Sequence, residues 1–278
     1  MMKDFRVALV QMDSQRDKEE NLRKMEEGIR EAAKNGANLV VFPETVEYIG
    51  PDMGAHASLV PGKITERFSC MARENGVWLH AGSITEKHEE KARNLSMLFS
   101  PDGRCVASYR KLHMFDVTVE DGPSYRESDE ILPGKTVCLA DTDLGKLGLS
   151  ICYDLRFPQL FRLMADNGAE VLIVSANFTD ATGEAHWEPL LRARAIENTC
   201  YVLACGQCGQ KTAFKAHGHS MVIDPWGRIV AEAEDEERIL YADLSADILK
   251  KTRKQIPCLE NQREDLYQLR CGSVAICD

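Results

Sequence analysis

The chain has 278 residues, of which 44% are hydrophobic and 28% charged, the balance of an ordinary globular protein. Its net charge of −10 and isoelectric point near 5.3 argue against a general nucleic-acid or anionic-membrane surface as its partner. No apolar run approaches the roughly 18 residues of a membrane span, and residues 1–7 show no signal region. We therefore expect a cytoplasmic protein whose ten cysteines stay reduced.

The first part of the chain predicts strands alternating with helices. Phe5 to Met12 has the apolar run of a buried strand, and Asn38 to Phe42 predicts the next one. Between them, residues 18–35 place apolar side chains on one helical face: Leu22, Met25, Ile29 and Ala33. We expect this helix to end at Asn35-Gly36, because glycine adopts a left-handed cap at little cost.

The same unit of helix, cap and strand recurs twice further along. Asn75-Gly76 precedes the strand-like residues 77–81, and Asn167-Gly168 precedes the strand-like residues 171–174. Two interpretations remain open. Connections from helix to strand commonly use Asn-Gly, and the recurrence is equally consistent with an internal pseudo-repeat.

Hairpin signals complete the predicted architecture. Ser100 to Gly103 (Ser-Pro-Asp-Gly) and Asp224 to Gly227 (Asp-Pro-Trp-Gly) each lie between two strand-like runs. Antiparallel pairs mixed with helix-linked strands predict an α/β fold, with two mixed sheets packed face to face and helices outside. Residues 1–278 contain no Ser/Gly/Pro-rich linker, so we expect one domain. Residues 116–129 predict a long lid-like loop, and residues 257–278 an extended tail.

Three chemically active side chains follow predicted strands. Glu44 comes after the strand 38–42, Lys111 ends a hairpin strand, and Cys152 follows the run from Lys146 to Ile151. Alone, each has an ordinary structural explanation, since a free cysteine is usually a buried core residue. Together they supply a nucleophile, a proton acceptor and a cation for a developing oxyanion, the set that amide hydrolysis needs. A lysine beside Cys152 would also favour its thiolate.

These residues lie in motifs that resemble a known family. Phe42-Pro43-Glu44, the run from Tyr109 to His113 (Tyr-Arg-Lys-Leu-His) and the run from Gly148 to Pro158 (Gly-Leu-Ser-Ile-Cys-Tyr-Asp-Leu-Arg-Phe-Pro) resemble the three signatures of the nitrilase superfamily, the carbon–nitrogen hydrolases. They occur in the family's order, and the similarity runs from about residue 5 to residue 268. The resemblance implies a four-layer α-β-β-α sandwich and subunits paired at least as a homodimer.

The resemblance also implies roles for individual residues. Glu44 would be the general base, Cys152 the nucleophile and Lys111 the stabiliser of the tetrahedral intermediate. Glu127 matches a second acidic residue of the family, although Asp129 and Glu130 are competing carboxylates. The backbone N–H of Tyr153 would face the oxyanion at the turn from strand to helix. No metal or organic cofactor is implied, and the partner is a small amide.

Further runs resemble one branch of the family, the ω-amidases and deaminated-glutathione amidases. Residues 185–198 and 218–227 carry this similarity. Such enzymes cleave a terminal amide of a molecule that carries a carboxylate elsewhere. Arg156 is the expected carboxylate clamp, and Phe178 and Thr182 match pocket positions of this group. An ion pair of Arg156 with Asp154 or with a tail carboxylate is the structural alternative.

Other functions stay open at this stage. Residues 45–48 (Thr-Val-Glu-Tyr) fit neither subgroup closely, so the substrate is undecided, and nitrile or N-carbamoyl hydrolysis are the alternatives within the family. Cys205, Cys208, His217 and His219 could instead suggest a zinc or thiol site. The single residue between the two histidines is shorter than the spacing of zinc modules, which disfavours that interpretation. A non-catalytic binding protein is disfavoured because Glu44, Lys111 and Cys152 are all present.

Overall fold

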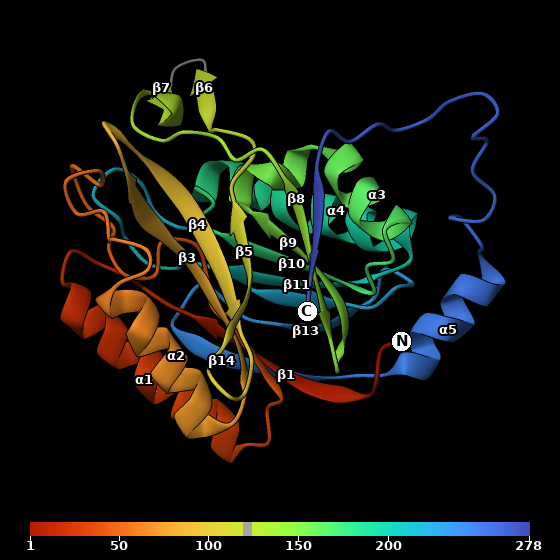
Figure 1. Cartoon of the computed structure of the whole chain (residues 1–278), viewed down its shortest axis with the longest axis horizontal. Coiled ribbons are helices and arrows are strands. Elements are labelled where there is room, and N and C mark those ends of the chain that lie inside the picture. The colour runs from red at the N-terminus through yellow and green to blue at the C-terminus, as the bar shows by residue number, and fades with distance from the viewer. Residues whose placement is uncertain (119–123) are drawn as a thin grey trace.

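The computed structural model describes residues 1–118 and 124–278, and their strands form two large sheets (Figure 1). The first sheet, in spatial order, consists of β14 (Arg238–Leu244), β1 (Phe5–Gln11), β2 (Leu39–Val41), β3 (Trp78–His88), β4 (Lys91–Phe99) and β5 (Cys105–Arg110). The second consists of β13 (Ile229–Glu232), β12 (Met221–Ile223), β11 (Tyr201–Gly206), β10 (Val171–Ala176), β9 (Gly145–Ile151), β8 (Val137–Thr142) and β15 (Val274–Cys277). Both sheets contain parallel and antiparallel pairs.

Helices cover the outer faces of the two sheets. Figure 1 shows α1 and α2 beside the first sheet and α3 and α4 beside the second, with α5 near one end. The bounds are α1 (Lys18–Lys34), α2 (Lys63–Asn75), α3 (Pro158–Asp166), α4 (Asp180–Asn198) and α5 (Ala246–Gln255). The predicted four-layer α-β-β-α sandwich is confirmed. Among the described residues, no helix combines the length and apolar character needed to cross a bilayer.

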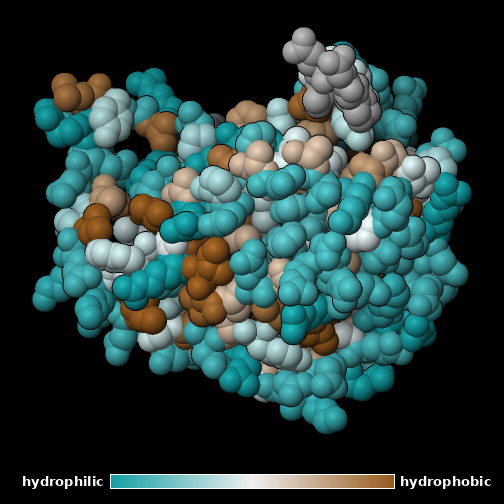
Figure 2. All heavy atoms as spheres, turned by 180° about the vertical axis from the view of Figure 1, so that it is seen from behind, coloured by the Kyte–Doolittle hydropathy of each residue, from teal (hydrophilic) through white to brown (hydrophobic). Residues whose placement is uncertain are grey.

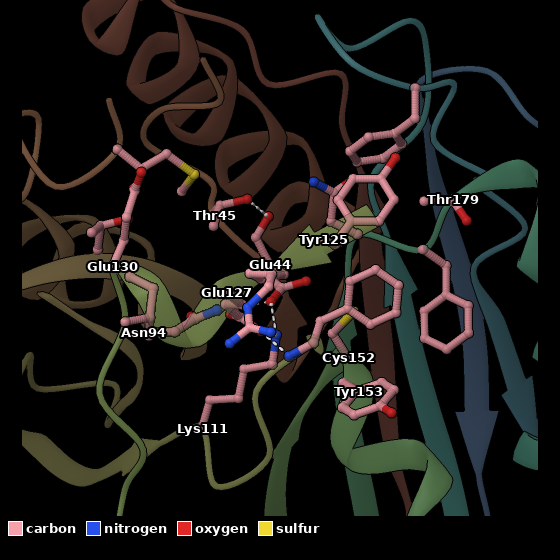
Figure 3. A pocket seen from close by; sticks show the side chains of 18 of the residues that line it. Glu44, Thr45, Asn94, Lys111, Tyr125, Glu127, Glu130, Cys152, Tyr153 and Thr179 are labelled. Atoms are coloured by element: carbon pink, nitrogen blue, oxygen red, sulfur yellow. Dashed lines mark hydrogen bonds and ion pairs between the residues drawn. The ribbon is translucent and has the colours of Figure 1, made fainter. Parts of the chain in front are cut away.

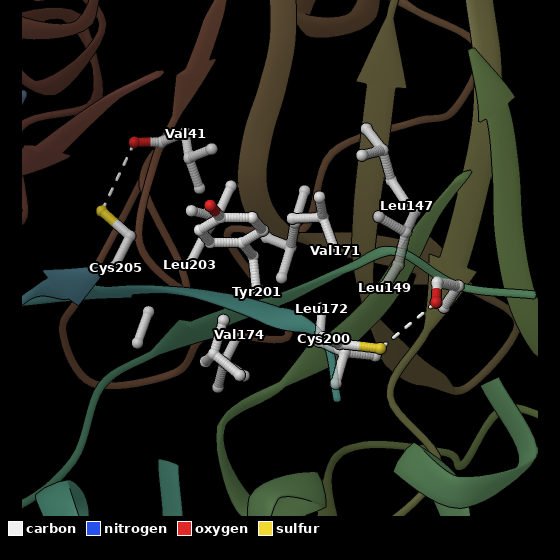
Figure 4. Packing of buried hydrophobic residues seen from close by; sticks show 14 of the residues in the cluster. Val41, Leu147, Leu149, Val171, Leu172, Val174, Cys200, Tyr201, Leu203 and Cys205 are labelled. Carbon is white, nitrogen blue, oxygen red and sulfur yellow. Dashed lines mark hydrogen bonds between the residues drawn. The ribbon is translucent and has the colours of Figure 1, made fainter. Parts of the chain in front are cut away.

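Alternation along the strands explains the layering. In β1, Val7 and Leu9 pack with second-sheet residues in one core cluster, whereas Ala8 and Val10 pack with the helices in another. Successive side chains of a strand point to opposite faces, so one apolar run serves both layers. The core between the sheets is close-packed. In it, Cys205 on β11 donates a hydrogen bond to the carbonyl of Val41 on β2, with 3.4 Å between sulfur and oxygen (Figure 4).

The three predicted Asn-Gly caps are present. Gly36, Gly76 and Gly168 have φ angles of 79°, 61° and 90°, in the left-handed region that glycine adopts without a Cβ clash. The two predicted hairpins are also present, as β4–β5 and β12–β13. Local sequence chemistry therefore determines these connections.

The prediction of a long loop over residues 116–129 was wrong for most of that segment. Asp116–Thr118 and Ser124–Arg126 form β6 and β7, a small antiparallel pair that a 3₁₀ turn at Glu127–Asp129 follows. Residues 119–123 of the predicted loop lie outside the described residues. The alternation of a three-residue strand is too short to distinguish from a loop by pattern.

The C-terminal tail returns from α5 to the second sheet and ends in a strand (Figure 1). Within the tail predicted to be extended, β15 pairs in parallel with β8 at the edge of the second sheet. Before it, Leu266 and Tyr267 are 70% and 61% exposed. Figure 2 shows the back of the molecule, where apolar side chains interrupt a largely hydrophilic surface.

Candidate active site

Strand ends bring the predicted site residues together. Glu44 follows β2, Lys111 follows β5, and Cys152 follows β9. Lys111 Nζ lies 3.0 Å from Glu44 Oε1 and 2.9 Å from a carboxylate oxygen of Glu127. Figure 3 shows these side chains converging beside Cys152. The sequence prediction that these four residues are neighbours agrees with this geometry.

The Cys152 backbone is held in an unusual conformation. Cys152 begins the 3₁₀ turn Cys152–Arg156 directly after β9, and its φ angle is +49°. A side chain with a Cβ rarely adopts this region, at a cost of about 1–3 kcal/mol. Tyr153 follows in the first turn, where backbone N–H groups lack an intrahelical acceptor. The strained turn places Cys152 and Tyr153 next to each other at the cavity, which both residues line.

The site lies in a concave cavity of about 310 Å³. This is the size of a small-molecule site. Aromatic and polar side chains line it in addition to the predicted residues, among them Phe115, Tyr125, Asn177, Thr179 and Phe214. The cavity therefore fits a compact substrate rather than a polymer.

Burial governs the protonation of the central groups. Burial and then the charge of Glu44 raise the pKa of the Cys152 thiol well above its usual value, against a smaller opposing effect of Lys111. Lys111 does favour the thiolate, as expected from the sequence, but burial and the charge of Glu44 outweigh its effect on the pKa of the thiol. Burial alone would lower the pKa of Lys111, but Glu127 and Glu44 outweigh it and hold that pKa well above its usual value. Lys111 stays an ammonium.

Glu127 contacts the cluster, unlike the carboxylates beside it. Besides pairing with Lys111, the Glu127 carboxylate accepts a hydrogen bond from the backbone N–H of Phe115, with 2.6 Å between that nitrogen and Oε2. Asp129 instead lies 3.9 Å from Arg126 at the surface. Glu130 lines the cavity, but the cation nearest the thiol, Lys111, pairs with Glu44 and Glu127. Of the three candidates, Glu127 is thus the one that contacts Lys111.

Sequence reasoning missed two residues that hold Glu44. Asn94 Nδ2 donates to Glu44 Oε1 at 2.8 Å, and Gln207 Nε2 donates to the Glu44 backbone carbonyl at 2.9 Å. Counting back through the predicted hairpin from Phe99 and Arg104 would have placed Asn94 opposite Tyr109. A register shift between Leu98 and Phe99 instead brings Asn94 opposite Lys111, whose N–H donates to the Asn94 carbonyl. Gln207 is 163 positions from Glu44, and no local signal could have found it.

The predicted substrate-binding residues line the same cavity. Arg156 lies over the rings of Phe178 and Tyr153, with its guanidinium carbon 5.4 and 5.9 Å from their centres. Phe178 is buried. The hydroxyl groups of Thr182 and Thr179 form a hydrogen bond, with 2.9 Å between their oxygens. All three therefore occupy positions from which they could contact a ligand.

The ion pair that was the alternative role for Arg156 does not occur among the described residues. Within the described residues Arg156 has no carboxylate within ion-pair distance, and its guanidinium lies 3.3 Å from His186 Nδ1. The Asp154 carboxylate faces away, toward Tyr109 and His113. The guanidinium lines the cavity, and no ion pair holds it to a carboxylate of the described residues.

The cysteines and histidines considered as zinc ligands have other contacts. Cys205 Sγ donates to two backbone carbonyls between the sheets, and His217 Nδ1 lies 3.1 Å from Asp180. No group of three or more metal-ligating side chains occurs in the part of the chain that the structure describes.

The family model for the carbon–nitrogen hydrolases matches residues 6–254, and the chain belongs to this family. The chain is 39% identical over 269 residues to the omega-amidase NIT2 of Mus musculus, an alignment covering 96% of this chain and 98% of that one. It is 40% identical over 271 residues to the deaminated glutathione amidase of Bos taurus, covering 94% and 83%.

A solved structure gives the same assignment for the fold. The Saccharomyces cerevisiae protein Nit3, a member of branch 10 of the nitrilase superfamily, superposes with a TM-score of 0.86 at 33% identity. The match covers 94% of this chain and 97% of that one. The resemblance to the nitrilase superfamily, drawn from three short motifs, is confirmed.

Proposed function

We propose that the protein is an amidase that hydrolyses the terminal carboxamide of a small carboxylate-bearing molecule through a thioester on Cys152. The observation that carries this proposal is the Lys111 ammonium between the carboxylates of Glu44 and Glu127, facing a buried thiol in a compact cavity. A nucleophile, a base and a fixed cation are the groups that acyl transfer from nitrogen requires.

The first half of the reaction uses the neutral thiol. Asn94 and Lys111 both donate to Glu44 Oε1, which leaves the other oxygen for the Cys152 proton. As the sulfur attacks the amide carbon, Glu44 accepts that proton. Lys111 and the Tyr153 N–H stabilise the oxyanion, and because both are fixed beforehand, little reorganisation is needed. Glu44 then returns the proton to the departing nitrogen, and ammonia leaves.

The second half hydrolyses the thioester. Glu44 accepts a proton from the attacking water, the tetrahedral intermediate forms against the same donors, and the proton returns to the Cys152 sulfur. Glu127 keeps Lys111 charged and oriented in both halves. Glu44 returns each proton that it accepts within the same half of the reaction, so the cycle needs no further proton donor or acceptor.

The carboxylate of the substrate would pair with Arg156. Its guanidinium lies against Phe178 and faces the cavity without a carboxylate partner among the described residues. A planar fork of donors suits a carboxylate through two parallel hydrogen bonds. Deaminated glutathione and α-keto ω-amides, suggested by the names of the relatives, both present such a group beside a terminal amide.

We also infer a cytoplasmic homodimer. The acidic composition, with reduced cysteines throughout, supports that location. The exposed apolar side chains of the tail support an interface with a second copy.

Ammonia release from a panel of ω-amides, nitriles and N-carbamoyl compounds tests the proposal. We expect release from carboxylate-bearing amides, without carbon dioxide, and its loss in Cys152→Ser, whose circular dichroism should match the parent. Cys208→Ser, at another buried cysteine, is the matched control and should retain turnover. Carbon dioxide released together with ammonia, or substantial activity in Cys152→Ser, would show that the assignment is wrong.

A further inference from the structure

A fully buried carboxylate that the mechanism does not use lies two residues beyond Cys152. Asp154 is 0% exposed. A charge removed from water is tolerated only where several donors replace the lost hydration. This carboxylate has four such contacts, two on each oxygen. They are Tyr109 Oη at 2.6 Å and Ile151 N at 2.9 Å on Oδ2, with His113 Nδ1 at 2.7 Å and His113 N at 3.1 Å on Oδ1.

The positions of these donors in the chain connect two parts of the site. Tyr109 and His113 lie two residues before and two residues after Lys111. Ile151 immediately precedes Cys152. One carboxylate therefore fixes the chain on both sides of the cation and also the backbone next to the nucleophile.

We infer that Asp154 is a positioning residue, which holds the Lys111 segment and the Cys152 turn at a fixed separation. The inference rests on the proposed function for the roles of those two residues. Asp154 touches neither the cavity lining nor the reacting groups, so it acts through its neighbours.

Both segments need such an anchor. The left-handed conformation of Cys152 persists only if the surrounding structure enforces it, and the hydrogen bond from Ile151 N–H to Asp154 closes the turn across that residue. Lys111 follows the last residue of β5 and keeps one backbone hydrogen bond to Asn94 on β4. Two residues further on, the backbone N–H of His113 donates to Asp154 instead of to a neighbouring strand. His113 stacks on Phe157 with 3.6 Å between ring centres, which fixes the ring that donates to Asp154.

The first test replaces the carboxylate by its isosteric amide. Asp154→Asn puts an N–H group where the site supplies donors, so at least one hydrogen bond is lost. With α-ketoglutaramate as substrate, we expect kcat to fall at least about 100-fold while KM changes less than about threefold, because a misplaced catalytic group costs rate rather than binding. The matched control is Asp224→Asn, a buried carboxylate that accepts two backbone N–H groups in the β12–β13 turn. It should leave both constants unchanged.

The second test does not depend on the substrate. Tyr109→Phe removes one donor to Asp154 without changing any charge. The rate at which iodoacetamide alkylates Cys152 is measured against pH. If Lys111 recedes from the thiol, the pKa of Cys152 rises further, and the midpoint of the profile moves up by about half a unit or more.

The outcomes distinguish the two proposals. A shifted midpoint in Tyr109→Phe supports the inference even if no amide is turned over, in which case the proposed function alone fails. An unchanged midpoint, or a loss in Asp154→Asn that appears only in KM, overturns it. Should Asp154→Asn not fold, the alkylation profile of Tyr109→Phe decides the question alone.

Discussion

The charge of Glu44 has two opposed effects on the residue it serves. It raises the pKa of the Cys152 thiol at rest and accepts the thiol proton during attack. Glu44→Gln should therefore make the thiol easier to ionise and the enzyme slower. We expect the midpoint of Cys152 alkylation against pH to move down, while kcat falls about 100- to 10,000-fold.

Lys111→Met is the matched control, because it should shift the pKa of Cys152 in the opposite direction. Lys111 lowers the pKa of Cys152, so its removal should move the alkylation midpoint up. Shifts of both variants in the same direction would contradict this account of the site.

Arg156 should determine which amides the cavity prefers. Removing a charge-assisted bidentate pair costs roughly 2–4 kcal/mol, so Arg156→Met should lower kcat/KM for α-ketoglutaramate about 30- to 1000-fold. Propionamide, a short neutral amide, should be much less affected. Arg156→Lys should restore only part of the loss, because an ammonium lacks the planar fork. Equal losses on both substrates would show that Arg156 supports structure instead of recognition.

At the scale of the elements, helix caps contribute measurable stability. Gly76 ends α2 with φ +61°, and no atom lies within 4 Å of the position its Cβ would take. Any cost of Gly76→Ala is therefore conformational, and we expect a loss of about 1 kcal/mol in the free energy of unfolding from urea denaturation. Gly54→Ala, also in open space but outside the left-handed region, should stay within about 0.5 kcal/mol of the parent. A similar loss in both variants would exclude the cap as the cause.

The elements also show how far the sequence could be interpreted. Caps, hairpins and the strand ends that carry Glu44, Lys111 and Cys152 depend on neighbours in the chain, so their patterns were informative. Asn94 depends on a cross-strand register, and Gln207 on a contact between the two sheets. The neutral Cys152 thiol depends on burial by the whole fold, which outweighs the neighbouring lysine. No local motif predicts which of the two effects, burial or the lysine charge, determines the pKa of the thiol.

For the whole molecule, we expect assembly through the tail. Sedimentation at micromolar concentration should give at least twice the 31.1 kDa chain mass. Replacing Leu266 and Tyr267 together by glutamate should weaken the association, because it places charges on the exposed apolar surface of the tail. Leu59→Glu, at an apolar residue 67% exposed outside the tail, is the control. A single 31 kDa species for the parent would rule out the dimer.

The pairing of β1 with β14 constrains the order in which the protein can form during synthesis. Phe5 pairs with Leu244, so one edge of β1 stays unpaired until residue 244 has emerged from the ribosome. The second sheet is completed later still, by β15. Contacts this distant close large loops and slow folding. A nascent chain therefore exposes one apolar edge of β1 until residues 238–244 have been made, and during that time chaperones can bind that edge.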